Sequence, residues 1–291
     1  MQSILDAINN WIKEILIGGI LSNFTNLFDT VNSKVGEIAV EVGKTPSDWN
    51  SSIYSFIRNL SETVLLPIAG IVITFVMCYE LISMIIDKNN MHDFPPSDIF
   101  KWVFKTLIAV LIVTNVFDTV MAIFDVGQQI VSNSSGFIVG SAAIDITATI
   151  ETLTATLDSY DIGPLFSLFL QSFIAQFAMS VLSICIFIVI YGRMIEIYMV
   201  TALAPIPFAT MANKEWGSIG QNYIKSLCAL AIQAFLIMVC VGIYSVLVND
   251  IAMSVDDDPM SAIWTCMGYT VLLCFTLFKT GSIAKSVFNA H

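Results

Sequence analysis

Long apolar runs alternate with short polar segments along most of the chain. Five runs have the roughly 20 apolar residues that a helix needs to cross a bilayer; they occupy 64–86, 103–124, 165–191, 226–248 and 262–279. A sixth stretch, 194–212, is also apolar, but it contains Glu196 near its start and Pro205 and Pro207 near its middle. The pattern predicts an all-α, multi-pass membrane protein with five or six spans.

Composition supports the membrane assignment. The chain is 56% hydrophobic and only 12% charged, and its mean hydropathy is +0.81. A water-soluble core built from 291 residues cannot bury that much apolar surface.

The positions of the basic residues decide between five and six spans. If 194–212 does not cross, all the basic residues that border the spans face the cytoplasm, and the loops 125–164 and 249–261, which lack Lys and Arg, face outward. If it crosses, four of these basic residues move outside and Asp256, Asp257 and Asp258 move inside. The cytoplasmic set of the five-span topology is Lys88, Lys101, Lys105, Arg193, Lys214, Lys225, Lys279 and Lys285.

The charge distribution therefore favours five spans with the N-terminus outside and the C-terminus inside. In this topology 194–212 is a proline-broken re-entrant or interfacial element. Residues 1–63 form an extracytoplasmic amphipathic helical region. Residues 64–291 form the transmembrane domain, with a central outer loop at 125–164 and a cytoplasmic loop at 192–225. Nine acidic residues in the two outer loops make that face anionic, so an outer nucleic-acid-binding surface is not expected.

Two amphipathic stretches precede the first span. Apolar residues recur at helical spacing over 4–16, a stretch that includes Trp11, and again over 24–35. The first stretch can rest on lipid or on neighbouring protein. A turn follows at Thr45-Pro46, with Ser47 as the expected N-cap of the next helix, and Pro67 is expected to kink that helix.

The outer loop at 125–164 is long enough to have a role of its own. Its first part, 131–136, is predicted to be flexible, and 144–157 is predicted to form a modest helix. The loop can cap a translocation path, contact an outer partner or simply connect two spans.

The sequence contains little that indicates a catalytic, metal-binding or cofactor-binding site. All six cysteines lie inside apolar runs without metal or redox spacing, and the two histidines, His92 and His291, are far apart. No metal, cofactor or catalytic residue is predicted, and the protein is not expected to be an enzyme. Without a phosphate loop the chain cannot itself supply ATP-driven force.

A few polar residues at membrane depth are candidates for function. Glu80 lies in the inner half of the first span, where it can reach the interface or pair with Lys105 on the next helix. Asn115 and Asp118 lie one turn apart in the second span, where they can snorkel outward or line an aqueous vestibule. Amides in the later spans more often join helices or subunits than bind substrate; these are Gln171, Gln176 and Gln233.

The most unusual local sequence runs from 191 to 223. Arg193 and Glu196 share a helix face and can form a pair, whereas Pro205 and Pro207 remove two backbone donors and break the helix. A tryptophan, Trp216, follows in a short connector. The parts that stand out are Arg-x-x-Glu at 193–196, Ala-Pro-Ile-Pro-Phe-Ala at 204–209, Asn-Lys-Glu-Trp-Gly at 213–217 and Tyr-Ile-Lys-Ser-Leu at 223–227.

This segment resembles the TrbL family of polytopic inner-membrane proteins in type IV secretion and conjugation machines, most strongly over 165–285. The resemblance implies a channel or scaffold subunit for DNA or protein translocation, working beside a partner ATPase and other membrane subunits, as a homo-oligomer in a bacterial inner membrane. It also implies that Arg193 and Trp216 serve assembly or partner contact. The alternative is a small-solute or ion transporter, although the midplane charges and paired broken helices of such proteins are not evident.

The topology is testable by cysteine labelling. We expect Ser132→Cys and Ser254→Cys to react with a membrane-impermeant thiol reagent added outside, because both lie in predicted outer loops. Ser218→Cys should react only after permeabilisation. External labelling at position 218 would restore the sixth span and contradict the orientation.

Overall fold

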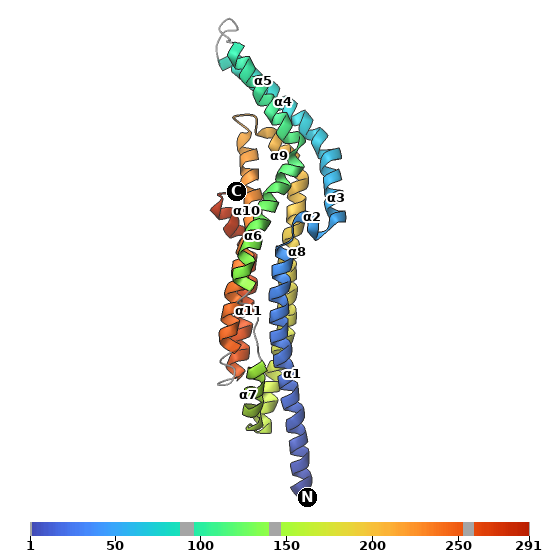
Figure 1. Ribbon diagram of the computed structural model, residues 1–291, viewed down its shortest axis with the longest axis vertical. Coiled ribbons are helices and arrows are strands. Elements are labelled where there is room, and N and C mark those ends of the chain that lie inside the picture. Colours follow the sequence, from blue (N-terminus) through green and yellow to red (C-terminus); the bar gives the residue numbers. More distant parts are fainter. Residues whose placement is uncertain (1, 88–95, 140–146, 253–258, 291) are drawn as a thin grey trace. The chain divides into compact units, whose positions relative to one another are not determined.

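A computed structural model describes residues 2–87, 96–139, 147–252 and 259–290 (Figure 1). Within these ranges every regular element is a helix, so the predicted all-α class is confirmed. The elements are α1 (Gln2–Val42), α2 (Pro46–Trp49), α3 (Ser51–Leu60), the π-helix η1 (Ser61–Leu65), α4 (Leu66–Asp87), α5 (Pro96–Thr114), α6 (Val116–Val139), α7 (Thr147–Asp158), α8 (Ile162–Leu203), α9 (Pro205–Thr210), α10 (Gly217–Ala252) and α11 (Pro259–Val287).

Four helical stretches are long and apolar enough to cross a membrane, namely Ser51–Ile86, Ile162–Leu203, Gly217–Ile251 and Ser261–Val287. A fifth span arises if the pair Pro96–Thr114 and Val116–Ser134 counts as one, although the two helices are bent by 68°. The predicted count of five is met only with this bent pair. The orientation stays a prediction, and Lys88, His92, Ser254 and Asp256 to Asp258 lie outside the described residues.

The chain divides into two compact units. Unit 1 comprises residues 1–42, 132–190 and 236–280, and unit 2 comprises 43–131, 191–235 and 281–291. The helices α6, α8, α10 and α11 each continue from one unit into the other.

In unit 1, α1 buries one face along most of its length. Its buried side chains recur every three or four residues, as on a helix that packs one stripe against its neighbours. Next to this stripe Asn23 Nδ2 donates a hydrogen bond to Ser172 Oγ on α8 (2.9 Å). The first turns of α1 present an exposed apolar stripe instead, with Trp11 62% exposed. The buried stripe consists of Ile20, Phe24, Leu27, Val31, Val35, Ile38 and Val42.

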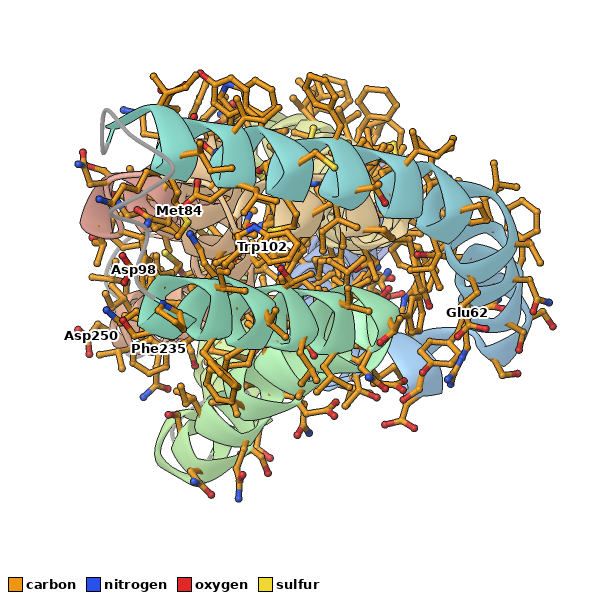
Figure 2. The ribbon with its side chains drawn as sticks, turned by 90° about the horizontal axis from the view of Figure 1, so that it is seen from above. Glu62, Met84, Asp98, Trp102, Phe235 and Asp250 are labelled. Atoms are coloured by element: carbon orange, nitrogen blue, oxygen red, sulfur yellow. The ribbon has the colours of Figure 1, made fainter. Side chains whose placement is uncertain are left out.

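Unit 2 has its own apolar core, to which α4, α5, α6, α8, α9 and α10 contribute. The indole of Trp102 lies between α4 and α5 (Figure 2) and donates its N–H to Met77 O (3.1 Å). The buried core residues include Ile73, Val76, Val116, Val120, Phe124, Ile197, Phe208, Leu227 and Leu230.

Several predicted boundaries are wrong. The second span is not one helix over 103–124, because the chain breaks between Thr114 and Val116. The segment 131–136 is not flexible loop but part of α6. The cap predicted at Ser47 is absent: Thr45 Oγ1 caps α2 by accepting from Asp48 N, and Asn50 caps α3 by accepting from Ile53 N (3.0 Å). At the starts of α2 and α3, a hydrogen bond to the preceding side chain, rather than the apolar pattern, sets the helix end.

The predicted helix within the outer loop is present where the structure describes it, as α7 at Thr147–Asp158. The kink expected at Pro67 takes the form of the π-helix η1 just before it, in which Leu66 N–H donates to Ser61 O. A proline ring clashes with the carbonyl of the preceding turn, and the wider π turn provides room.

In unit 2, α6 and α10 approach each other closely at Gly127. A Cβ placed on Gly127 would lie 2.9 Å from both Cβ and O of Ala231 on α10. We expect Gly127→Ala to force α6 and α10 apart and to destabilise the fold by about 1–3 kcal/mol, seen as a lower thermal unfolding midpoint of the detergent-purified protein. Gly70→Ala is the matched control, since nothing lies within 4 Å of its Cβ position; equal midpoints for the two variants would contradict the close approach.

Candidate functional site at the proline-broken element

The helix α8 stops at Leu203, and the short α9 begins at Pro205, as the two prolines predict. Pro205 and Pro207 have no N–H to donate, so carbonyls in the preceding turns lose their usual partners. Ala204 N donates to Thr201 O (3.2 Å), the carbonyl that Pro205 leaves without its usual partner, and near the end of α9 Thr210 Oγ1 donates to Pro207 O (2.7 Å). The chain itself therefore supplies hydrogen bonds at the start and near the end of α9, as a break in apolar surroundings requires.

Glu80 anchors the connector that follows α9. Lys105 Nζ on α5 donates to Glu80 Oε1 (2.7 Å), which is the pairing that the sequence offered as one alternative. Asn213 Nδ2 donates to Glu80 Oε2 (2.9 Å). The carboxylate thus accepts one charged and one neutral hydrogen bond and holds two segments against α4.

Asn213 is the residue that makes this link. It is 4% exposed, and its Oδ1 accepts hydrogen bonds from the backbone N–H groups of Glu215 (2.7 Å) and Trp216 (3.2 Å). Both ends of one side-chain amide are therefore used. The sequence reasoning did not single out Asn213, although it lies inside the connector motif that was recognised.

Trp216 is held by aromatic neighbours on α4. Its ring stacks on Phe75 (centroids 5.6 Å apart, planes at 13°) and on Tyr79 (5.5 Å, 12°). Tyr79 OH also donates to Glu215 Oε2 (3.0 Å). Trp216 thus fastens the connector to α4 within the chain, and a contact of Trp216 with a partner stays a proposal.

Gly220 allows α10 to begin close under the break. A Cβ at this position would lie 2.6 Å from Pro207 O and 2.0 Å from Met211 Cγ. One turn later, Tyr223 OH donates to Val200 O on α8, and the Tyr223 and Phe208 rings meet edge to face with centroids 6.1 Å apart. Tyr223 therefore joins the start of α10 to both α8 and α9.

Arg193 and Glu196 do not form the pair that their spacing suggested. Glu196 Oε1 accepts from Lys285 Nζ instead (3.3 Å). Arg193 points inward, is 7% exposed, and donates to Leu230 O (3.4 Å); its Nε has no hydrogen-bond partner among the described residues. Tertiary packing separates the two side chains although they share a turn.

The remaining polar candidates fall in different places. In unit 2, Asn115 is the residue between α5 and α6, and Asp118 lies in the first turn of α6. Gln233 lies beside Gly281 in the same unit. In unit 1, Gln171 accepts a hydrogen bond from Trp264 Nε1 (2.8 Å), which joins two helices, and Gln176 is half-buried on α8. The structure therefore brings together only part of the predicted set.

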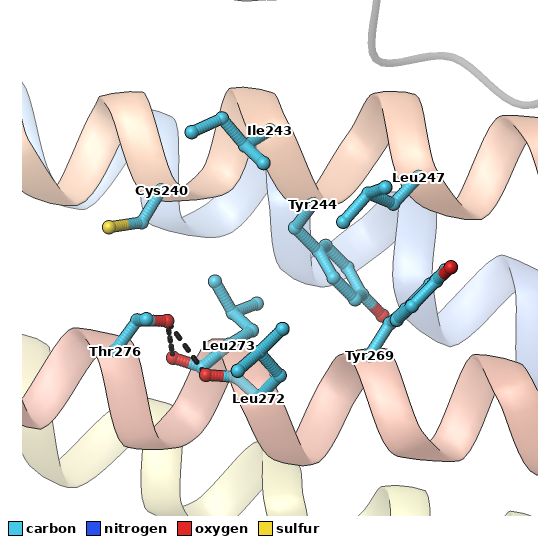
Figure 3. A pocket seen from close by; sticks show the side chains of 8 residues that line it. All are labelled: Cys240, Ile243, Tyr244, Leu247, Tyr269, Leu272, Leu273 and Thr276. Carbon is cyan, nitrogen blue, oxygen red and sulfur yellow. Dashed lines mark hydrogen bonds between the residues drawn. The ribbon is translucent and has the colours of Figure 1, made fainter.

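Unit 1 contains an apolar pocket of about 90 Å³ between α10 and α11 (Figure 3). Cys240, Ile243 and Tyr244 line it from α10, and Leu272 and Thr276 from α11. The Tyr244 and Thr270 hydroxyls, 2.7 Å apart, share a buried hydrogen bond beside it. Thr276 Oγ1 bonds to backbone carbonyls of its own helix (2.7 and 2.9 Å). The lining supplies apolar packing and no base for a nucleophile.

Within the described ranges, no group of three or more His, Cys, Asp or Glu side chains is arranged to hold a metal ion. The polar side chains around α9 bind one another and the backbone. Glu80, Asn213 and Glu215 each accept hydrogen bonds from the chain itself, so the helix break is held by internal hydrogen bonds.

Apolar helices long enough to span a bilayer, together with a broken helix secured by buried polar groups, define a multi-pass helical membrane protein. The sequence profile of the family described as TrbL/VirB6 plasmid conjugal transfer like protein matches residues 31–205, and the chain belongs to that family. It is accordingly a component of a conjugal transfer system, and the family is one of structural transfer-system subunits rather than of known enzymes. Comparisons with curated proteins and with solved structures give no match.

The range matched by the family profile, 31–205, differs from 165–285, the range over which the sequence resembles the family most strongly. It includes Arg193, Glu196 and Pro205, and it begins within α1. It ends before Pro207, Asn213 and Trp216. The family assignment is confirmed, and the strongest resemblance expected over 165–285 is matched only as far as 205.

The anchor at Glu80 can be tested by limited proteolysis. We expect Glu80→Ala to leave Lys105 and the Asn213 amide without their acceptor, at a cost of about 1–3 kcal/mol, so that the connector opens more often. Trypsin should then cut after the exposed Lys214 at least about fivefold faster than in the unmodified protein. Glu196→Ala is the matched control, because it removes a half-exposed ion pair elsewhere in unit 2; equal acceleration in both variants would contradict the anchor.

Proposed function

We propose that this protein is a channel or scaffold subunit of a conjugative type IV secretion system that supports translocation of DNA or protein across a bacterial inner membrane. The observation that carries the proposal is the family match over 31–205 on a chain of membrane-length helices. The anchored break adds support, because a rigid break inside apolar surroundings suits a stationary part of a larger membrane assembly.

The energy for translocation comes from partner proteins in this proposal. The sequence contains no phosphate-binding loop, and the polar groups around α9 are occupied by one another. An ATPase and other membrane subunits of the same system are the expected partners.

Self-association is the expected arrangement. Large apolar side chains stay exposed on α5, among them Phe100 and Phe104, and either lipid or other subunits can cover them. The exposed connector residues Lys214 and Glu215 offer a polar surface for other subunits.

The alternative is a solute or ion transporter. A transporter should move solute by itself, whereas a secretion subunit depends on partner proteins. A secretion subunit should co-purify with the ATPase of its system, and its deletion should abolish conjugation. Saturable solute uptake by the purified chain alone in liposomes, with normal conjugation after deletion, would overturn the proposal.

A charge reversal on the connector tests the partner surface. We expect Lys214→Glu to lower the frequency of plasmid transfer at least about tenfold while the protein level stays unchanged, because a charge at an interface mainly affects recognition. Lys101→Glu is the control: its side chain is 76% exposed in the same unit, on α5. Equal transfer by both variants and the unmodified protein would exclude the connector as a partner surface.

A further inference from the structure

Arg193 on α8 is a buried arginine whose hydrogen-bonding capacity is largely unused. It is 7% exposed, and its Nη2 donates to Leu230 O over a long distance of 3.4 Å. Its Nη1 lies 4.0 Å from the sulfur of Met194, which is a weak acceptor. Its Nε has no hydrogen-bond partner among the described residues. A buried guanidinium with so few strong partners is costly to the state in which it occurs.

Glu196 is a carboxylate that can serve two cations. It lies one turn after Arg193 on α8, at a spacing that brings the side chains of a helix close to each other, and its negative charge favours the charged form of Arg193. Its Oε1 nevertheless accepts from Lys285 Nζ on α11 (3.3 Å), in a pair whose side chains are 40% and 46% exposed. Because exposed ion pairs contribute little to stability, Glu196 is paired with the cation that gives the smaller electrostatic gain.

The last turns of α11, residues 281–287, explain why Lys285 holds this carboxylate. A Cβ on Gly281 would lie 3.3 Å from Gln233 Nε2, so α11 approaches α10 closely there. Ala284, one turn later, is 1% exposed. Lys285 follows on the same side of the helix, where it reaches α8 through its ion pair. Close packing therefore seats the end of α11, and the weak ion pair is its charged contact with α8.

We propose that residues 281–287 form a releasable latch, and that Glu196 exchanges one cation for the other when the latch opens. In the latched state, which the structure shows, Glu196 pairs with Lys285, and Arg193 lacks a carboxylate. In the released state the latch leaves α8, and Glu196 turns back to Arg193 by rotation of side chains on a single helix. Arg193 thus lowers the free-energy cost of release, because the carboxylate that loses Lys285 gains another partner.

A purely structural arginine makes the opposite prediction for its own removal. If Arg193 served only to join α8 to Leu230 O on α10, an apolar replacement would loosen the surface on which the latch is seated. If Arg193 is the second partner of Glu196, the same replacement removes a poorly satisfied charge from the latched state and a partner from the released state. The latch then closes more firmly. The proposal concerns movement within the isolated chain and does not depend on the role in conjugation.

Alkylation of a thiol beneath the latch measures release in the full-length protein in detergent. Ala284→Cys places the thiol at a buried position, on a tryptic peptide that contains no native cysteine, and mass spectrometry follows its reaction with N-ethylmaleimide. We expect Lys285→Met to raise the rate, and Arg193→Met to lower it, each at least about threefold. Arg58→Met is the control, because this arginine of unit 2 pairs with Glu62 one turn away (2.8 Å). A rate that Arg193→Met raises or leaves unchanged would overturn the proposal.

Thermal unfolding tests the exchange of partners without the added thiol, with far-UV circular dichroism confirming that each variant is folded. In the Lys285→Met protein Glu196 pairs with Arg193, so Glu196→Gln should lower the unfolding midpoint by at least about 2 °C. When Arg193→Met is also present, Glu196→Gln should leave the midpoint unchanged. An equal decrease in both proteins, or no decrease in either, would overturn the exchange. Conjugation assays are not involved, so the secretion proposal stands or falls separately.

Discussion

The pairing of polar groups in an apolar environment is the constraint on which unit 2 depends. A carboxylate on a membrane-length helix is costly unless charged or hydrogen-bonding partners face it. Glu80 meets this requirement through Lys105 and Asn213. Because Asn213 also caps the backbone of Glu215 and Trp216, the same carboxylate holds the chain that leaves α9. The pairing therefore adds to the aromatic contacts of Trp216 in holding the chain after α9 on α4.

The breaks themselves follow a similar logic. Proline removes a backbone donor at Pro205 and Pro207, and the Ala204 N–H donates to Thr201 O, the carbonyl that Pro205 leaves without its usual partner. Small residues then let the next helix approach, as Gly220 does beneath Pro207. The irregular segments of this protein are thus closely packed, and their irregularity is compatible with a rigid structure.

Membership of the TrbL/VirB6 family places this fold in a conjugal transfer system. In the proposed role, this subunit keeps its geometry while partner proteins supply the energy for translocation. Aromatic stacking of Trp216 on Phe75 and Tyr79, and the ion pair of Glu196 with Lys285, join segments that are distant in sequence. The stacking contacts hold the connector after α9 on α4, and its role as a surface for other subunits stays a proposal.

Much of the fold was determined by the sequence alone. Apolar runs and the two prolines predicted the membrane helices and the break before Pro205, because hydrophobic length and a missing N–H act locally. The Lys105–Glu80 pair was foreseeable, since both residues lie on neighbouring spans. Only the tertiary structure decided that Arg193 and Glu196 separate and that Asn213 is the central link. Those outcomes depend on contacts between helices far apart in the chain, and helical spacing specifies which residues share a face but not which face meets which neighbour.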